Sequence, residues 1–213
     1  MRVVIIDVET TGLNVAKDDR VVEIGAVEIV DGKITDNHFQ AYINPHRKSE
    51  PEAFKLHGLS EEFLSNKPDF IDIVDKFIEF VDGADELSFY NRNFDKSAIR
   101  TEFTRCGMKA RFQAINKLDS SCLWQELKTE YKTSNKIRMT LDYACMLFGI
   151  SLEEREEEGH GALLDAYLTA ELYVRYKVLN QVASIPKKKV SDKKKQPKPR
   201  KKAPKYIQTL RPI

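Results

Sequence analysis

The chain begins with Arg2-Val3-Val4-Ile5-Ile6-Asp7-Val8-Glu9-Thr10-Thr11-Gly12-Leu13, an apolar run that ends on two acids one residue apart. The β-branched run predicts a buried strand over residues 2–8. Because strand side chains alternate with period two, Asp7 and Glu9 should project from the same face. Two carboxylates on a rigid element suit a hard cation such as Mg²⁺ or Mn²⁺. The alternative is a strand that simply ends in solvated acids, and these residues alone leave both readings open.

The following sequence predicts a mixed α/β sheet with helices on its faces. Residues 20–30 predict a second strand, Asp31-Gly32 a two-residue hairpin, and residues 33–43 a third strand, which together make an antiparallel meander. Strands and helices then alternate along the chain. The later elements expected from periodicity and stop signals are a helix over 68–81, a strand over 86–89, a helix opening near residue 93, and helices over 120–131, 140–148 and 162–179.

Length and composition predict one catalytic-sized domain over residues 1–180. The chain has 213 residues, of which 41% are hydrophobic, and this suffices for one core. No apolar run is long enough to span a membrane and no secretory leader precedes the first strand, so a cytoplasmic location is expected. The three cysteines are widely spaced and form no CxxC pair, which argues against a disulfide framework and a zinc site.

Charge is divided between an acidic body and a basic tail. Residues 187–213 hold twelve Lys or Arg and one acid, so 23 basic and 32 acidic residues remain in the body. The lysines and prolines of residues 181–205 predict a flexible linker, and the apolar residues 206–213 predict a docking peptide. Such a tail suits contact with nucleic acid or a protein partner. A frayed, solubilising end is the alternative.

Two further acids and a histidine lie far along the chain. Asp95 follows the predicted strand over 86–89 and opens a helix, while Asp165 lies one turn into the helix that starts near residue 162. His160 stands between two glycines before that helix, where it can reach the same site as Asp165. Each has an ordinary alternative reading, since acids in a first helical turn complement the helix dipole and His160 could be a surface residue.

Taken together, the motifs resemble those of the DnaQ-like 3′-to-5′ exonucleases, which carry four acids and a histidine in this order. The resemblance covers about residues 1–180, including segments 22–28 and 51–59, and is nearest to the proofreading subunits of bacterial replicative polymerases. It implies a ribonuclease H-like fold with a mixed five-stranded sheet, and release of nucleoside 5′-monophosphates from 3′ ends. The motifs that carry it are Asp7-x-Glu9, Asn91-x-x-Phe94-Asp95 and His160-x-Ala162-x-x-Asp165.

The resemblance also implies roles for individual residues. His160 would be the general base toward the attacking water, which suits an imidazole near neutral pH. Two Mg²⁺ or Mn²⁺ ions would be held by Asp7, Glu9, Asp95 and Asp165. The terminal nucleotide would be positioned by Thr10, Leu13, Glu52, His57, Asn91 and Phe94. For Leu13 and Phe94, a place in the hydrophobic core is the alternative.

The implied partners are the single-stranded 3′ end of DNA and a polymerase subunit that binds residues 206–213. Residues 181–185 also weakly resemble a peptide that binds a sliding clamp.

Two departures from the family pattern stand out: Tyr90 replaces the usual His before Asn91, and an acidic run over 153–158 precedes His160. The negative charges of this run would favour the protonated imidazole of His160, so the pH optimum of the activity should be shifted to the alkaline side.

Two other functions remain open from the sequence. An exonuclease that trims RNA or short oligonucleotides would use the same acids, because they act on the phosphate and not on the sugar. A non-catalytic polymerase-associated module could keep the fold for binding alone. The complete set of four acids and a histidine argues against that module, since a scaffold has no need of them.

Overall fold

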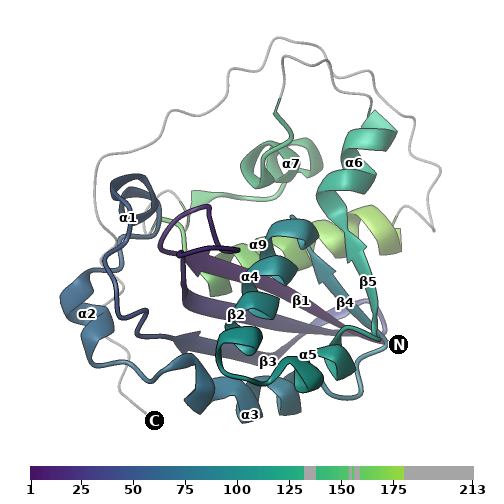
Figure 1. The fold of residues 1–213 in the computed structure, drawn as a ribbon. Helices are drawn as coiled ribbons and strands as arrows, with labels where there is room; N and C mark the ends of the chain where they lie inside the picture. The colour runs from purple at the N-terminus through teal and green to yellow at the C-terminus, as the bar shows by residue number, and fades with distance from the viewer. Residues whose placement is uncertain (132–137, 154, 156–158, 180–213) are drawn as a thin grey trace.

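The computed structural model describes residues 1–131, 138–153, 155 and 159–179 (Figure 1). Its centre is a five-stranded sheet in the order β3-β2-β1-β4-β5. β1, β2 and β3 form the predicted antiparallel meander, and β4 and β5 add to β1 in parallel. The predicted mixed α/β sheet is therefore confirmed. The strands are β1 (Arg2–Thr10), β2 (Val21–Val30), β3 (Lys33–Tyr42), β4 (Glu86–Phe89) and β5 (Asp119–Cys122).

The hairpin between β2 and β3 forms at the predicted pair. Asp31 has φ 50° and Gly32 has φ 77°. A type I′ turn requires positive φ at both central residues, and Asp-Gly meets this requirement at low steric cost. The carboxylate of Asp31 also accepts a hydrogen bond from the N-terminal ammonium group at 2.6 Å. The start of β1 is thereby tied to the end of β2.

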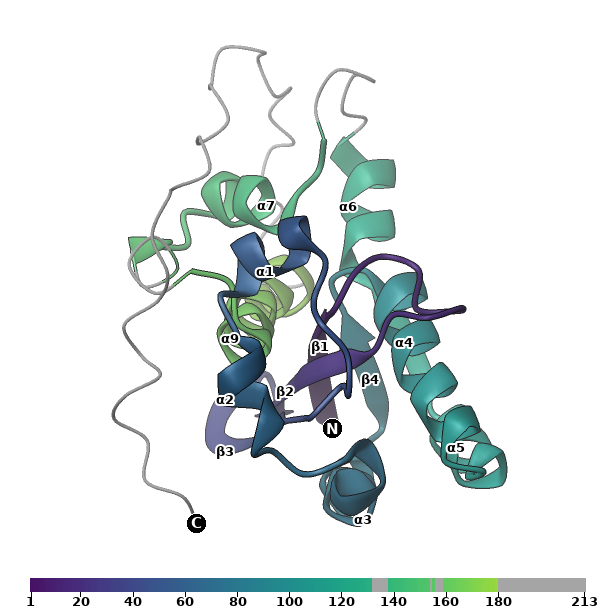
Figure 2. The same ribbon diagram turned by 60° about the vertical axis from the view of Figure 1, so that its left-hand side comes forward.

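Helices cover both faces of the sheet (Figures 1 and 2). On one face, Val4 and Ile6 of β1 pack with α3, α4 and α5. On the other face, Val3 and Ile5 pack with α6, α7 and α9. Alternate residues of β1 thus serve two cores, as period two requires. These helices are α3 (Phe70–Val81), α4 (Arg92–Arg105), α5 (Lys109–Ile115), α6 (Leu123–Tyr131), α7 (Leu141–Phe148) and α9 (Ala162–Tyr173).

Local capping explains why two helices begin where the sequence predicts. Asp69 and Asp72 form a capping box at the start of α3, which satisfies backbone donors that have no partner inside the helix. Thr140 accepts a hydrogen bond from the Tyr143 backbone N–H at 3.2 Å and so caps α7. Two short helices, α1 (Pro51–His57) and α2 (Glu61–Ser65), join β3 to α3.

Two sequence predictions are wrong in detail. Residues 120–122 belong to β5 and not to a helix, and Ser121 donates to the Ser88 hydroxyl of β4 at 2.7 Å. Parallel pairing depends on a distant strand, so the local pattern does not reveal it. The helix over 162–179 ends as α9 at Tyr173 and continues as a π-helix over Val174–Leu179. The sequence also does not predict α1, α2 and α5, which have five to seven residues, too few for a clear period.

Part of the sequence prediction falls beyond the described residues. The linker (181–205), the clamp-like peptide (181–185) and the docking peptide (206–213) all lie there. Among the helices that the structure does describe, none has the length and apolar character needed to cross a membrane.

Candidate active site

Asp7 and Glu9 share one face of the sheet, as strand alternation predicts. In the antiparallel pair of β1 and β2, Asp7 lies opposite Gly25 and Glu9 lies opposite Glu23. Directly opposed residues project to the same side. A Cβ atom on Gly25 would stand 2.3 Å from the carbonyl carbon of Ala162, so this side of the sheet meets the first turn of α9. Both acids therefore face the start of that helix.

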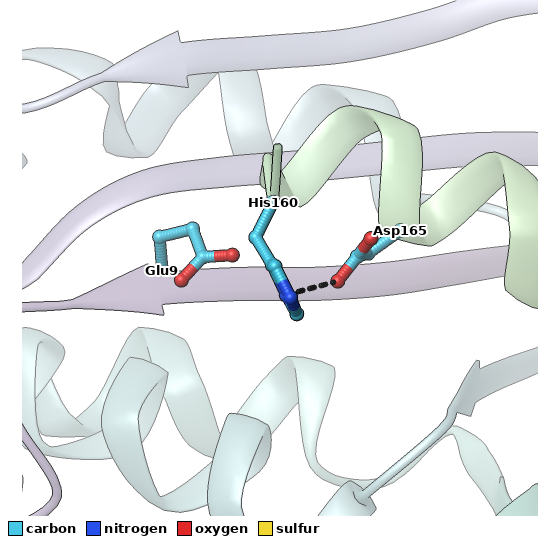
Figure 3. Close-up of side chains that lie close together, drawn as sticks. All are labelled: Glu9, His160 and Asp165. Atoms are coloured by element: carbon cyan, nitrogen blue, oxygen red, sulfur yellow. Dashed lines mark ion pairs between the residues drawn. The ribbon is translucent and has the colours of Figure 1, made fainter. Parts of the chain in front are cut away.

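His160 and Asp165 come to the same place from the start of α9. His160 precedes the helix, its backbone N–H donating to the Leu56 carbonyl of α1 at 3.4 Å. Its Nδ1 atom lies 3.6 Å from Oδ2 of the buried Asp165 (Figure 3). Ligand atoms of Glu9, His160 and Asp165 all lie within 4.8 Å of one another. Side chains from β1, the loop before α9 and α9 itself thus converge on one point.

Asp95 joins this cluster from the first turn of α4. It is buried, and burial raises its pKa to about 8, although hydrogen bonds from backbone N–H groups, including that of Val8 in β1, counteract the rise. Burial also raises the pKa of Asp7 well above its usual value, and the nearby Asp95, Asp165 and Glu9 raise it further. Four carboxylates therefore share one poorly solvated volume.

The donor set of this cluster fits a hard divalent cation. Among the described residues, Oδ2 of Asp95 and Oδ1 of Asp165 are buried without a hydrogen-bond partner. The pKa of Glu9 is also raised well above its usual value, first by burial and then by the negative charge of Asp165 and Glu23. Crowded, desolvated carboxylates are stabilised by protons or by cations. Oxygen donors of this kind suit Mg²⁺ and Mn²⁺.

Arg155 belongs to the site, and the sequence reasoning missed it. Its side chain is 8% exposed and forms an ion pair with Asp142 of α7. Its Nη2 atom lies 2.7 Å from Oδ2 of Asp165 and 2.6 Å from Nδ1 of His160. Its positive charge lowers the raised pKa of Asp7 and of Glu9. In the sequence, Arg155 is marked out by being a single basic residue within the otherwise acidic run over 153–158.

The acidic run itself is only partly covered by the structure. Of its glutamates, Glu153 is described and exposed, whereas Glu154 and residues 156–158 lie outside the described part of the chain. The effect of the run on His160 and on the pH optimum therefore stays a prediction.

The residues expected to position a nucleotide occupy different environments. Leu13 is 84% exposed, so it is no core residue, whereas Phe94 is half-buried and packs against the core between the sheet and α3. Glu52 is exposed on the first turn of α1, and Asn91 is the exposed N-cap of α4. Thr10 is buried and its hydroxyl donates to the Gly12 carbonyl at 2.7 Å. Thr10 thus shapes the turn that presents Leu13.

His57 is buried beside His160. Its Nδ1 atom accepts a hydrogen bond from the Leu59 backbone N–H at 3.0 Å, whereas Nε2 is buried without a partner among the described residues. Burial, and then the charge of His160, lowers the pKa of His57 to about 4. His57 is therefore neutral near pH 7, with its proton on Nε2.

Tyr90 serves the core. It is buried on the face covered by α6, α7 and α9, and its hydroxyl donates to the Met139 carbonyl at 2.7 Å. This bond holds the start of the α7 segment against the sheet. The departure at position 90 thus has a structural explanation.

The family model described as "Exonuclease" matches residues 4–173. The DNA polymerase III subunit epsilon of Salmonella typhimurium is 38% identical over 178 residues, which are 81% of this chain and 70% of the relative.

Solved structures show the same fold at low sequence identity. The nuclease domain of 3′hExo, a DEDDh family member bound to rAMP, has a TM-score of 0.66 at 16% identity and is matched over 82% of this chain and 90% of its own. Escherichia coli exonuclease I with a dA16 oligonucleotide has a TM-score of 0.69 at 17% identity, over 83% of this chain and 41% of its own.

Proposed function

The chain belongs to the exonuclease family, and on that premise we propose that it is the proofreading 3′-to-5′ exodeoxyribonuclease of a replicative DNA polymerase. The relatives that share 34–38% identity with it carry the name of the epsilon subunit of DNA polymerase III. The observation that carries the proposal is the convergence of Glu9, His160 and Asp165 within 4.8 Å, with Asp95 close enough to Asp7 to raise the pKa of Asp7.

The four clustered carboxylates of Asp7, Glu9, Asp95 and Asp165 would hold two divalent ions, either Mg²⁺ or Mn²⁺. When bound, ions of this class polarise the scissile phosphate and make a coordinated water more acidic. Support comes from the two buried carboxylate oxygens, on Asp95 and Asp165, for which the described part of the chain provides no hydrogen-bond donor. Support also comes from the raised pKa values of Asp7, Glu9 and Asp95. They indicate that the negative charges repel one another, and bound cations would relieve this repulsion.

His160 would take the proton from the attacking water. Its side chain is about one-third exposed, so water can reach it. For Nε2 to accept this proton, Nδ1 must carry the hydrogen of the neutral ring, which would point toward Asp165, 3.6 Å away. Arg155, which also lies near Nδ1, would then donate to Asp165 instead of to the ring. A base with a pKa near the working pH is best suited to this task.

The residues around the cluster would hold the terminal nucleotide without reading its base. Leu13 and Phe94 offer apolar surfaces, and Glu52, Asn91 and His57 offer polar groups, with Thr10 shaping the turn at Leu13. Apolar and stacking contacts tolerate any base. A proofreader needs this tolerance, since it must remove whichever nucleotide was misplaced.

Removal of nucleotides from RNA is the second candidate function. It is favoured by one observation, namely that the same fold is found with rAMP in 3′hExo and with a deoxyoligonucleotide in exonuclease I. At 16–17% identity these two structures speak only for the fold, so the preference for one sugar must be measured. A non-catalytic module is disfavoured, because crowded, buried carboxylates lower the stability of a scaffold.

The tail would place the enzyme near its polymerase. Residues 206–213 are proposed as the anchor to the polymerase catalytic subunit, residues 181–205 as the linker, and residues 181–185 as a weaker candidate for clamp contact. A flexible tether raises the effective concentration of the nuclease at the primer end. Deletion after Leu179 should abolish co-purification with the polymerase subunit, and unchanged binding would reject the anchor.

The proposed function is tested by one nuclease assay. DNA strands labelled at the 5′ end, with matched or mispaired 3′ ends, are compared with RNA of the same sequence in Mg²⁺ and in Mn²⁺. Stepwise shortening from the 3′ end, release of 5′-monophosphates, and faster cleavage of the mispaired DNA are expected. A strong preference for RNA would overturn the proofreading assignment.

A further inference from the structure

Glu23 is a buried acid next to the site that the proposed mechanism does not use. It lies on β2 directly opposite Glu9 and is 1% exposed. Buried carboxylates are rare in proteins unless other groups satisfy them. Its surroundings therefore indicate what this residue does.

The carboxylate of Glu23 caps the start of α9. Its Oε2 atom accepts a hydrogen bond from the Ala162 backbone N–H at 3.1 Å, the Leu163 N–H also bonds to the carboxylate, and Oε1 accepts from Nε2 of Gln40 at 2.8 Å. The N-cap residue of α9 is Gly161, which has no side chain to cap the helix. The first N–H groups of a helix lack partners within it and favour a negative charge. Glu23 supplies that cap from a different element.

Gly25 provides a second fixed point on the same strand. It projects to the same side as Glu23, and a Cβ atom there would lie 2.3 Å from the carbonyl carbon of Ala162 and from the backbone nitrogen of Leu163. The absence of a side chain lets the helix backbone touch β2. A polar clamp at Glu23 and a close contact at Gly25 therefore fix the first turn of α9 on the sheet.

We propose that Glu23 is a positioning residue for catalysis, which sets the start of α9 so that His160 and Asp165 lie against Glu9. His160 stands two residues before Ala162 and Asp165 three residues after it, so a shift of this turn moves both. Displacements of about 1 Å at reacting groups can lower rates about a hundredfold. The inference deepens the proposed function and rests on it.

The test compares Glu23→Ala, Glu23→Gln and Glu23→Asp with a control, Glu28→Gln. Glu28 is also a glutamate of β2 with a bonded carboxylate, but its partners are Arg2 and Thr35, at the opposite end of the strand pair. Four quantities are measured: the melting temperature, the amide hydrogen exchange of Ala162 and Leu163, the affinity for Mn²⁺ by calorimetry, and the kcat and KM of the nuclease reaction.

Glu23→Ala should lower kcat and the Mn²⁺ affinity by about 10- to 100-fold, change KM less, and accelerate exchange of the two amides. Glu23→Gln should keep most of the amide protection, because its side-chain oxygen still accepts hydrogen bonds, and should recover much of kcat. If Glu23→Ala does not fold, Glu23→Asp replaces it in the test. Its carboxylate lies one methylene farther from α9, so this variant should show intermediate losses of kcat, Mn²⁺ affinity and amide protection. Glu28→Gln should affect only the melting temperature.

The inference is overturned if Glu23→Ala, or Glu23→Asp in its place, retains wild-type amide protection, kcat and Mn²⁺ affinity. Failure of the proposed function looks different. In that case the wild-type protein cleaves no strand or strongly prefers RNA, while amide exchange and Mn²⁺ binding still report whether Glu23 fixes the start of α9.

Discussion

Glu9 and Asp165 come from the first strand and the last α-helix of the described chain, yet they offer carboxylate oxygens within 4.8 Å of each other. The contact between β2 and α9 brings them together, because β2 pairs with β1 and also receives the first turn of α9 at Gly25. The site therefore depends on long-range packing and not on one local motif. Its crowded carboxylates have consequences for stability, pH dependence and activity.

Asp95→Asn should change activity and stability in opposite directions. The amide should lower kcat by at least about 100-fold, because a charged oxygen of the site is lost. The variant should also melt at a higher temperature in chelator, because a buried acid with a pKa raised to about 8 is removed. Asp75→Asn, on the exposed face of α3, is the control and should change neither. A lower melting temperature for Asp95→Asn in chelator would contradict the electrostatic account.

The stability of the protein in chelator should fall as pH rises from about 4 to about 8. Burial raises the pKa of Asp95 from an ordinary value near 3.8 to about 8, and the pKa values of Asp7 and Glu9 are also raised. Between these limits the folded state keeps a proton that the unfolded state has lost, so deprotonation favours unfolding. Added Mn²⁺ should reverse the loss and raise the melting temperature more at pH 8 than at pH 5. A metal effect of equal size at both pH values would count against this prediction.

Arg155→Met should move the acidic limb of the pH–rate profile to higher pH. The guanidinium lowers the pKa values of Asp7 and Glu9. Its removal should raise these pKa values, so the carboxylates would ionise only at a higher pH. Methionine keeps much of the side-chain length without the charge. Arg111→Met removes an arginine that pairs with the exposed Asp75, and it should leave the profile unchanged. An unshifted profile for Arg155→Met would show that the guanidinium does not tune the site.

Tyr90→Phe should destabilise the fold without impairing catalysis. The lost hydrogen bond to the Met139 carbonyl should cost about 1 kcal/mol of unfolding free energy, measured by urea denaturation. The kcat and KM should stay within about twofold of wild type, since the phenol serves the core. A rise in KM with unchanged stability would instead assign Tyr90 to the substrate.

Much of this site could be predicted from the sequence because local rules govern its first members. Alternation along the first strand places Asp7 and Glu9 on one face, and the structure agrees. The Asp31-Gly32 hairpin and the meander are also confirmed. The exonuclease resemblance drawn from the spaced motifs is confirmed by the family match over residues 4–173.

Long-range partners are what the sequence could not reveal. β5 forms only because β4 offers it an edge, and Arg155 shows its role only where α7 and α9 meet around it. Glu23 lies in a strand that the sequence predicts correctly, but its partner is a helix end 139 residues away. Local periodicity carries no record of such contacts.

The most direct test of the account is the exonuclease activity of the double variant Asp7→Ala/Glu9→Ala on a mispaired DNA 3′ end. A double variant of two exposed acids on α3, Asp75→Ala/Glu79→Ala, controls for the loss of two negative charges. The Asp7→Ala/Glu9→Ala variant is expected to fold, to bind Mn²⁺ more weakly and to have no measurable activity, while the control retains wild-type activity. Activity that survives in the folded Asp7→Ala/Glu9→Ala variant would contradict the carboxylate site on which the proposal depends.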